Sequence, residues 1–187
     1  MSEQRQRILH DPMPRSTGAP MTKVALYTAY HKPAPKVQSE RMIPIHVGRS
    51  LAEAPLPGMI GDDEGTSISE RNANWCELTA LYWAWKNDRE SDVIGLMHYR
   101  RLLDIMDHSD TGDVEEFVPH IDLPDWCQEA ETWLTDRVDD YDIILPRLHR
   151  MGRTLEENYR EGHAAQDWDI MCDVLRSNHP EYSDSLN

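Results

Sequence analysis

Four short segments interrupt an otherwise polar chain, and each has the length of a β-strand. They are residues 24–30, 42–48, 92–98 and 141–146. Three of them are mainly apolar runs bounded by polar or turn residues, which is typical of strands covered on both faces of a parallel sheet. The second contains Pro44, which cannot donate a ladder hydrogen bond, so it is predicted at a sheet edge or in an irregular segment.

Helical periodicity separates and follows these segments. Between the second and third, apolar residues recur at helical spacing as far as about Asn87. Asn74 suits the N-cap of this helix, and Glu77 suits the reciprocal position of a capping box. Further helices are predicted from near Pro124 to about residue 138, from a capping box at residues 154–157, and over residues 168–177.

The order of these elements predicts the fold class. Strands alternate with helices, so we expect an α/β domain with a mainly parallel sheet flanked by helices over residues 22–187. Residues 1–21 are polar and interrupted by prolines, and they predict a disordered N-terminal extension. Residues 102–122 are acidic with weak periodicity, and they predict an excursion or lid-like loop.

Charge and composition narrow the classes of partner. Lys and Arg number 19 and Asp and Glu number 34, which gives a formal net charge of −15. A surface this acidic argues against a nucleic-acid partner, which needs a basic footprint. No apolar run approaches the about 18 residues of a membrane span, and three scattered cysteines form no zinc or redox motif. A reducing cytoplasmic location is therefore expected.

Cationic and aromatic side chains follow the predicted strands. His31 follows the first strand, and His98, Tyr99, Arg100 and Arg101 end the third. Ligands of open α/β sheets lie at the carboxyl ends of strands, and arginine matches phosphate or carboxylate oxygens with two hydrogen bonds. This pattern predicts an anion site; alternatively, both arginines pair with acidic residues and His98 is structural. The segment 141–146 is followed in the same way by Arg147, His149 and Arg150.

Two further places carry candidate acid–base or metal chemistry. The loop at residues 61–65 holds Asp62 and Asp63 between glycines, which could bind a divalent cation or form a solvated acidic turn. His163 and Asp167 would share a helix face if the third helix continued, as a metal pair or a proton-transfer dyad. The alternative is a helix break between them, with Asp167 capping the next helix.

Several segments in order resemble one bacterial family, catalogued as domain of unknown function 4422. Its members are described as capsular or exopolysaccharide biosynthesis proteins and glycosyltransferases, some of them galactofuranosyltransferases. The segments are residues 30–32 (YHK), 43–48 (IPIHVG), 61–65 (GDDEG), 68–72 (ISERN), 76–87 (CELTALYWAWKN) and 94–101 (IGLMHYRR). The resemblance runs from about Val24 to the end of the chain. The family domain normally continues further, so the resemblance implies a domain that is incomplete at its C-terminus.

The resemblance implies a GT-A-like, Rossmann-like fold and transfer of a sugar, with galactofuranose a candidate, from a nucleotide-diphosphate donor. The expected partners are a UDP-sugar, a polysaccharide or lipid-linked glycan acceptor, a second copy of the chain, and a divalent Mn or Mg ion. Peripheral association with the inner face of the membrane is also expected. The implied donor site comprises Thr28, His31, His98, Tyr99, Arg100 and Arg101, with Asp62 and Asp63 as sugar or metal ligands and His163 or Asp167 as the base.

Two other functions stay open at this stage. A domain of this kind could bind a nucleotide sugar or a partner protein without turnover, and an exposed apolar edge would indicate this. A metal-dependent hydrolase would instead require the acidic loop and the residues around His163 within reach of one ion.

Overall fold

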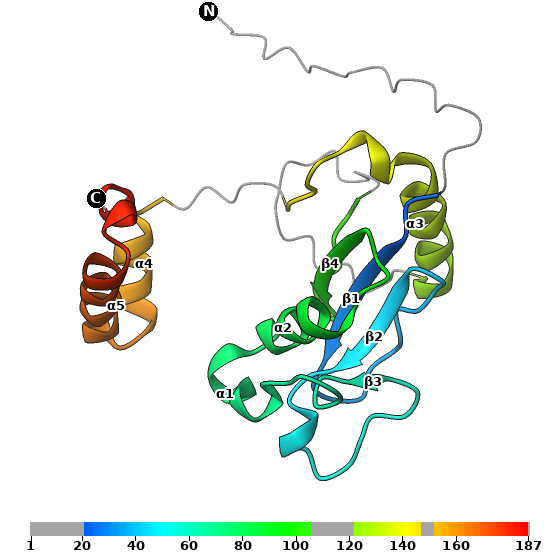
Figure 1. Cartoon of the computed structure of the whole chain (residues 1–187), viewed down its shortest axis with the longest axis horizontal. Helices are drawn as coiled ribbons and strands as arrows, with labels where there is room; N and C mark the ends of the chain where they lie inside the picture. The colour runs from blue at the N-terminus through cyan, green and yellow to red at the C-terminus, as the bar shows by residue number, and fades with distance from the viewer. Residues whose placement is uncertain (1–20, 106–121, 147–151, 187) are drawn as a thin grey trace, which may run out of the picture. The chain divides into compact units, whose positions relative to one another are not determined.

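The computed structural model describes residues 21–105, 122–146 and 152–186 (Figure 1). The chain divides into two compact units, Met1–Pro146 and Arg147–Asn187. The first unit contains the sheet, and the second consists of helices. No helix among the described residues is both long and apolar enough to cross a membrane.

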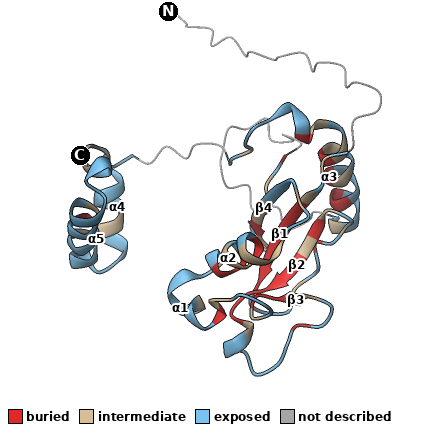
Figure 2. Cartoon of the chain, viewed as in Figure 1, coloured by how far each residue is buried: buried red, intermediate tan, exposed pale blue. Residues whose placement is uncertain are grey.

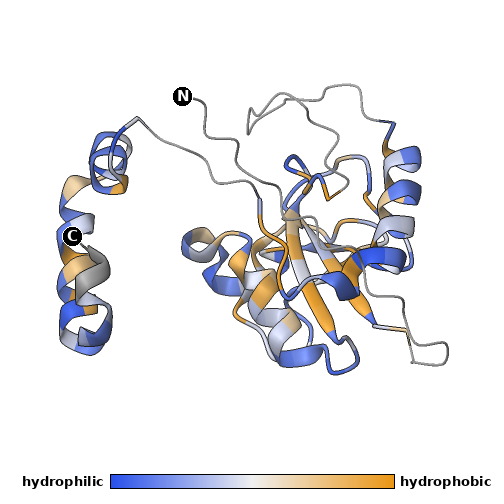
Figure 3. Ribbon diagram, turned by 90° about the horizontal axis from the view of Figure 1, so that it is seen from above, coloured by the Kyte–Doolittle hydropathy of each residue, from blue (hydrophilic) through white to orange (hydrophobic). Residues whose placement is uncertain are grey.

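A four-stranded parallel sheet in the order β3-β2-β1-β4 forms the centre of the first unit. Its strands are β1 (Val24–Tyr30), β2 (Met42–His46), β3 (Ile60–Gly61) and β4 (Val93–His98). The apolar runs that predicted β1 and β4 are these two strands, and the strands are hydrophobic in Figure 3. The expected α/β, GT-A-like class with a mainly parallel sheet is therefore confirmed.

The strand β2 lies inside the sheet, although Pro44 predicted an edge. It pairs with β1 along its whole length, whereas β3 pairs only with Ile45 and His46. At Pro44 the outer side of β2 therefore has no strand beside it, which is where a residue without an N–H is tolerated. The edge prediction was therefore wrong for β2 as a whole, but at Pro44 only β1 pairs with β2 among the described strands.

Helices cover both faces of the sheet, with alternate residues of β1 pointing to each. Leu26 and Met97 pack with α3 (Leu123–Arg137), whose Pro124 lies in the first turn as predicted. Ala25, Tyr27 and Ala29 pack with α2 (Leu78–Asn87) through Ala80 and Ala84, whose small side chains allow close approach. The sheet is the most buried part of this unit (Figure 2).

The predicted helix at residues 74–87 is two helices. The first is α1 (Asn72–Trp75), and α2 starts after a break at Cys76, whose φ of 46° is outside the helical range. Glu77 is the N-cap of α2, and no side chain caps that helix. The capping box between Asn74 and Glu77 was wrong, because the break lies between the two residues.

The third apolar run, residues 141–146, does not form a strand. Ile143 and Leu145 are 69% and 68% exposed, whereas Ile144 packs against the core on the α3 side. Tyr141 stacks on Trp133 at 5.6 Å between ring centroids, directly after the short helix η3 (Val138–Asp140). The apolar run matched a strand, but a strand also needs a ladder partner, which this segment lacks among the described residues. Arg147, His149 and Arg150 lie outside the described residues.

The second unit contains α4 (Leu155–Gly162), α5 (Ala165–Asn178) and the 3₁₀-helix η4 (Pro180–Leu186). The predicted capping box is confirmed, because Thr154 and Glu157 exchange side-chain to backbone hydrogen bonds. Short 3₁₀-helices η1 (Arg49–Leu51) and η2 (Ser69–Arg71) belong to the first unit.

Candidate functional site

The carboxyl ends of β1 and β4 bring the predicted ligand residues together. The two strands are parallel neighbours, with Ala29 opposite His98, so the residues that follow them meet at one edge of the sheet. The centroids of the His31 and His98 rings are 5.9 Å apart, and the Tyr99 ring lies 5.5 Å from His31 and 4.4 Å from His98. His31 is exposed, whereas His98 and Tyr99 are half-buried.

The geometry around His98 fixes its tautomer. Its Nδ1 accepts the backbone N–H of Arg100 at 3.1 Å, and its Nε2 lies 3.4 Å from Oε1 of Glu77. Burial lowers the pKa of His98, and the charges of Arg100 and Arg101 lower it further while Glu77 opposes them. The imidazole is thus neutral near pH 7, with its proton on Nε2 facing the glutamate.

The two arginines after β4 are exposed at this strand end. A tight turn, in which the Arg101 N–H donates to the His98 carbonyl at 2.8 Å, places them. The Arg100 guanidinium lies 5.5 Å from the Tyr99 ring centroid. Among the described residues, neither arginine forms an ion pair with a carboxylate. The planar guanidinium group matches the oxygens of a phosphate or carboxylate anion.

Thr28 is enclosed below this edge rather than open to solvent. It is fully buried in β1, and its hydroxyl has no partner among the described residues; the same holds for the Tyr99 hydroxyl. Tyr99 stacks on Tyr30 at 5.2 Å, and the Tyr30 hydroxyl accepts the Val37 N–H at 2.7 Å. Ligand contact by Thr28 stays a prediction.

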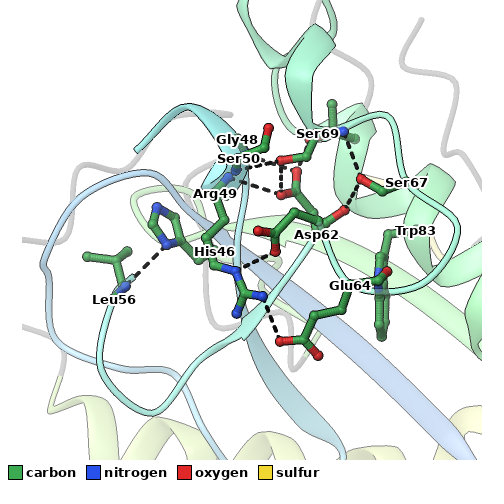
Figure 4. A network of polar contacts seen from close by, with 12 residues as sticks. His46, Gly48, Arg49, Ser50, Leu56, Asp62, Glu64, Ser67, Ser69 and Trp83 are labelled. Atoms are coloured by element: carbon green, nitrogen blue, oxygen red, sulfur yellow. Dashed lines mark hydrogen bonds and ion pairs between the residues drawn. The ribbon is translucent and has the colours of Figure 1, made fainter. Parts of the chain in front are cut away.

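Asp62 forms a closed network at the neighbouring strand ends (Figure 4). Its carboxylate is fully buried, and each oxygen accepts two hydrogen bonds. Oδ2 accepts from Gly48 N–H at 2.8 Å and Thr79 Oγ1 at 2.6 Å, and Oδ1 accepts from Arg49 N–H at 3.1 Å and Ser69 Oγ at 2.5 Å. This uses about all the acceptor positions that a carboxylate has.

Asp62 therefore ties the end of β2, the loop after β3 and the start of α2 to one another. The adjacent Asp63 pairs with Arg49, which also reaches Glu64 at 2.8 Å. In the part of the chain that the structure describes, no three His, Cys, Asp or Glu side chains are grouped to hold a metal ion. Sugar or metal binding by Asp62 and Asp63 stays a prediction, and it would require displacing protein partners. The loop does not fit a divalent cation as it stands.

His163 and Asp167 lie in the second unit, and the strand ends lie in the first. The helix break between them is confirmed, because α4 ends at Gly162 and His163 is its C-cap. The predicted cap at Asp167 was wrong, because the N-cap of α5 is Ala164. Asp167 lies in the first turn of α5, where its N–H donates to the Ala164 carbonyl. The two side chains do not form the shared helix face that the continuous helix required. Their assignment as the base stays a prediction without geometric support.

One residue at the strand ends was missed by the sequence analysis. Glu77 was interpreted as a helix cap, yet its carboxylate lies beside His98. Its place in the segment 76–87, the longest part of the family resemblance, was a signal that could have found it.

Comparison with known proteins places this geometry in a family. The chain matches the apo structure of the bifunctional glycosyltransferase WbbM with a TM-score of 0.71 and 31% sequence identity. The match covers 87% of this chain and 30% of that chain, so the protein spans about a third of the length of WbbM. No curated protein matches the chain. Residues 25–187 match the family described as domain of unknown function 4422, and the chain belongs to that family.

Proposed function

We propose that the protein is a glycosyltransferase that uses a nucleoside-diphosphate sugar. The observation that carries this proposal is the cluster of His31, His98 and Tyr99 beside two exposed arginines, at the carboxyl ends of adjacent parallel strands. The likeness to a bifunctional glycosyltransferase over 87% of the chain supports the reaction class.

The arrangement supplies what such a transfer needs from a donor site. The departing diphosphate requires positive charge, and Arg100 and Arg101 present it without a competing carboxylate among the described residues. Aromatic rings beside them suit the flat faces of a base or sugar. A neutral His98 with its proton on Nε2 adds no further charge and keeps the strand end ordered through Arg100.

We propose the donor, the sugar and the acceptor as follows. A UDP-sugar is the expected donor, with galactofuranose a candidate sugar, and a polysaccharide or lipid-linked glycan is the expected acceptor. A divalent Mn or Mg ion would have to be held by the donor diphosphate together with residues other than the present Asp62 network.

The test is a transfer assay with the full chain. Purified protein is incubated with a panel of UDP-, GDP- and dTDP-sugars, with and without Mn²⁺, together with oligosaccharide acceptors. Release of the nucleoside diphosphate is followed together with the mass of the acceptor. One donor that gives an acceptor longer by one sugar supports the proposal. Absence of both binding and transfer for every donor would overturn it.

A second candidate, a module that binds a nucleotide sugar or a partner without turnover, is favoured by one observation. Val93 and Ile94 are 37% and 36% exposed at the edge of the sheet, and Trp85 on α2 is 61% exposed. Exposed apolar groups of this kind are typical of interaction surfaces. Selective donor binding with no sugar transferred or hydrolysed would establish this candidate in place of the first.

A further inference from the structure

We propose that Glu77 is the catalytic base that removes the proton from the acceptor hydroxyl, with His98 holding its carboxylate in place. The inference rests on the proposed glycosyl transfer and assigns the step that the strand-end arginines cannot perform. Its geometric basis is the 3.4 Å distance from Oε1 of Glu77 to Nε2 of His98, at the edge where Arg100 and Arg101 emerge.

The backbone before Glu77 is held in an uncommon conformation. Cys76 has a φ of 46° and is the one non-glycine residue with positive φ among those the structure describes. Its carbonyl accepts from Asn72 Nδ2 at 2.7 Å. Such conformations cost about 1–3 kcal/mol and persist where surrounding contacts enforce them, often at functional sites. Here the break ends α1 and makes Glu77 the first residue of the turn into α2.

The contacts of His98 give Glu77 a defined partner. Because Nδ1 of His98 accepts the Arg100 N–H, the remaining ring proton is on Nε2 and faces the glutamate. A carboxylate oriented by an imidazole N–H is a common arrangement for proton transfer. The Glu77 side chain is 41% exposed, whereas that of His98 is 12% exposed, so the carboxylate keeps a face that an acceptor can reach.

The two aspartates of the loop after β3 are already bound to other protein groups. All four acceptor positions of Asp62 are filled, and Asp63 pairs with Arg49. Glu77 therefore combines an exposed carboxylate with a contact to His98, which lies two residues before Arg100.

The proposed transfer needs only the donor, the acceptor, Glu77 and the two arginines. The acceptor oxygen forms a bond to the anomeric carbon of the donor sugar while the bond from that carbon to the diphosphate oxygen breaks. The nucleoside diphosphate leaves with the electron pair of that bond, beside Arg100 and Arg101. The proton of the acceptor hydroxyl moves to Glu77, which returns it to solvent after the product leaves.

The experiment compares Glu77→Gln with wild type in the transfer assay. Glutamine keeps the size of the side chain and can keep its contact with His98, but it cannot accept the proton. We expect kcat to fall by about 100-fold or more, with the donor KM within a few-fold of wild type and the melting temperature unchanged. The matched control is Glu70→Gln, an exposed glutamate on η2, which should leave kcat unchanged.

A second variant separates catalysis from a structural role. In Glu77→Ala, added formate should restore part of the lost turnover, because a small carboxylate can occupy the space and accept the proton. If glutamine prevents folding, Glu77→Asp keeps the carboxylate but withdraws it, and kcat should fall while the donor KM holds.

The outcomes are distinguishable. Near-wild-type kcat in Glu77→Gln, or a loss confined to donor affinity, would overturn the assignment of Glu77 while leaving the transferase proposal standing. A wild-type protein that transfers no sugar from any donor would overturn the transferase proposal and this inference together.

Discussion

Two groups of polar residues lie at the same edge of the sheet, and the structure treats them in opposite ways. Around Asp62, every acceptor position of a buried carboxylate is used by four donors from three parts of the chain. At the end of β4, Arg100 and Arg101 are exposed and have no carboxylate partner among the described residues. Both groups were predicted from the sequence as ligand positions.

This difference distinguishes polar residues that hold the fold together from polar residues that can bind a ligand. A buried carboxylate is stable only if hydrogen bonds replace the water it has lost, so a saturated network such as that of Asp62 primarily holds the fold. Exposed arginines gain charge-assisted hydrogen bonds when they bind an anion. Substitutions in the two groups should therefore affect different measurements.

The largest effect is expected from Asp62→Asn. The N–H groups of Gly48 and Arg49 point to different oxygens of Asp62, so either orientation of the amide places its NH₂ against one backbone donor. We expect the free energy of unfolding to fall by about 3 kcal/mol, measured by urea denaturation, because hydrogen bonds to a buried charge are lost. The control is Asp63→Asn, which breaks a partly exposed ion pair and should cost about 1 kcal/mol or less. Equal losses in both variants would contradict the structural role of Asp62.

The next effect is expected from Arg100→Ala, and it concerns ligand affinity. Removing the guanidinium should weaken donor binding by about 2–3 kcal/mol, or roughly 100-fold, since hydrogen bonds between charged groups are lost. The melting temperature should stay unchanged because the side chain is exposed. Arg89→Ala, an exposed arginine in the loop before β4, is the matched control for loss of one positive charge. Unfolding of Arg100→Ala with intact donor affinity would reverse the distinction between the two groups.

The smallest effect concerns pH. Burial lowers the pKa of both His98 and His46, and each Nδ1 accepts a backbone N–H, from Arg100 and Leu56 respectively. Below about pH 6.5 the unfolded chain therefore binds more protons than the folded protein does. The stabilisation is full above that pH and is lost as the pH falls through the lowered folded-state values. At pH 5.5 we expect a loss of up to about 1.4 kcal/mol per histidine relative to pH 7.5.

Urea midpoints at the two pH values test this directly. His98→Gln should reduce the pH dependence without abolishing it, since His46 still contributes. A midpoint that is the same at pH 5.5 and 7.5 would contradict the neutral, buried state of both rings.

Local patterns in the sequence predicted much of the fold and part of the site. The apolar run identified β1 because this strand is buried on both faces, and a similar run identified β4 although Val93 and Ile94 at its start are exposed. Thr154 identified the start of α4 because its cap is made within one turn. The segment 141–146 has the same kind of run but pairs with no strand in the part of the chain that the structure describes, and pairing depends on residues that are distant in sequence.

Contacts between residues that are distant in sequence also limited the prediction of the candidate site. The residues after β1 and β4 could be placed together, because parallel neighbours end at one edge. The saturation of Asp62 and the contact of Glu77 with His98 depend on where Cys76 interrupts the helix. A positive φ at a cysteine has no signal in the hydrophobic pattern, so the sequence indicated a capping box instead.

The most direct test is a calorimetric comparison of UDP and uridine binding to wild type and to Arg100→Ala. We predict that wild type binds UDP more tightly than uridine, and that Arg100→Ala loses about 100-fold in affinity for UDP while its affinity for uridine is unchanged. The difference in UDP affinity between wild type and Arg100→Ala would then come only from contact with the diphosphate. Equal affinities of wild type and Arg100→Ala for UDP would contradict the claim that the end of β4 holds the diphosphate of the donor.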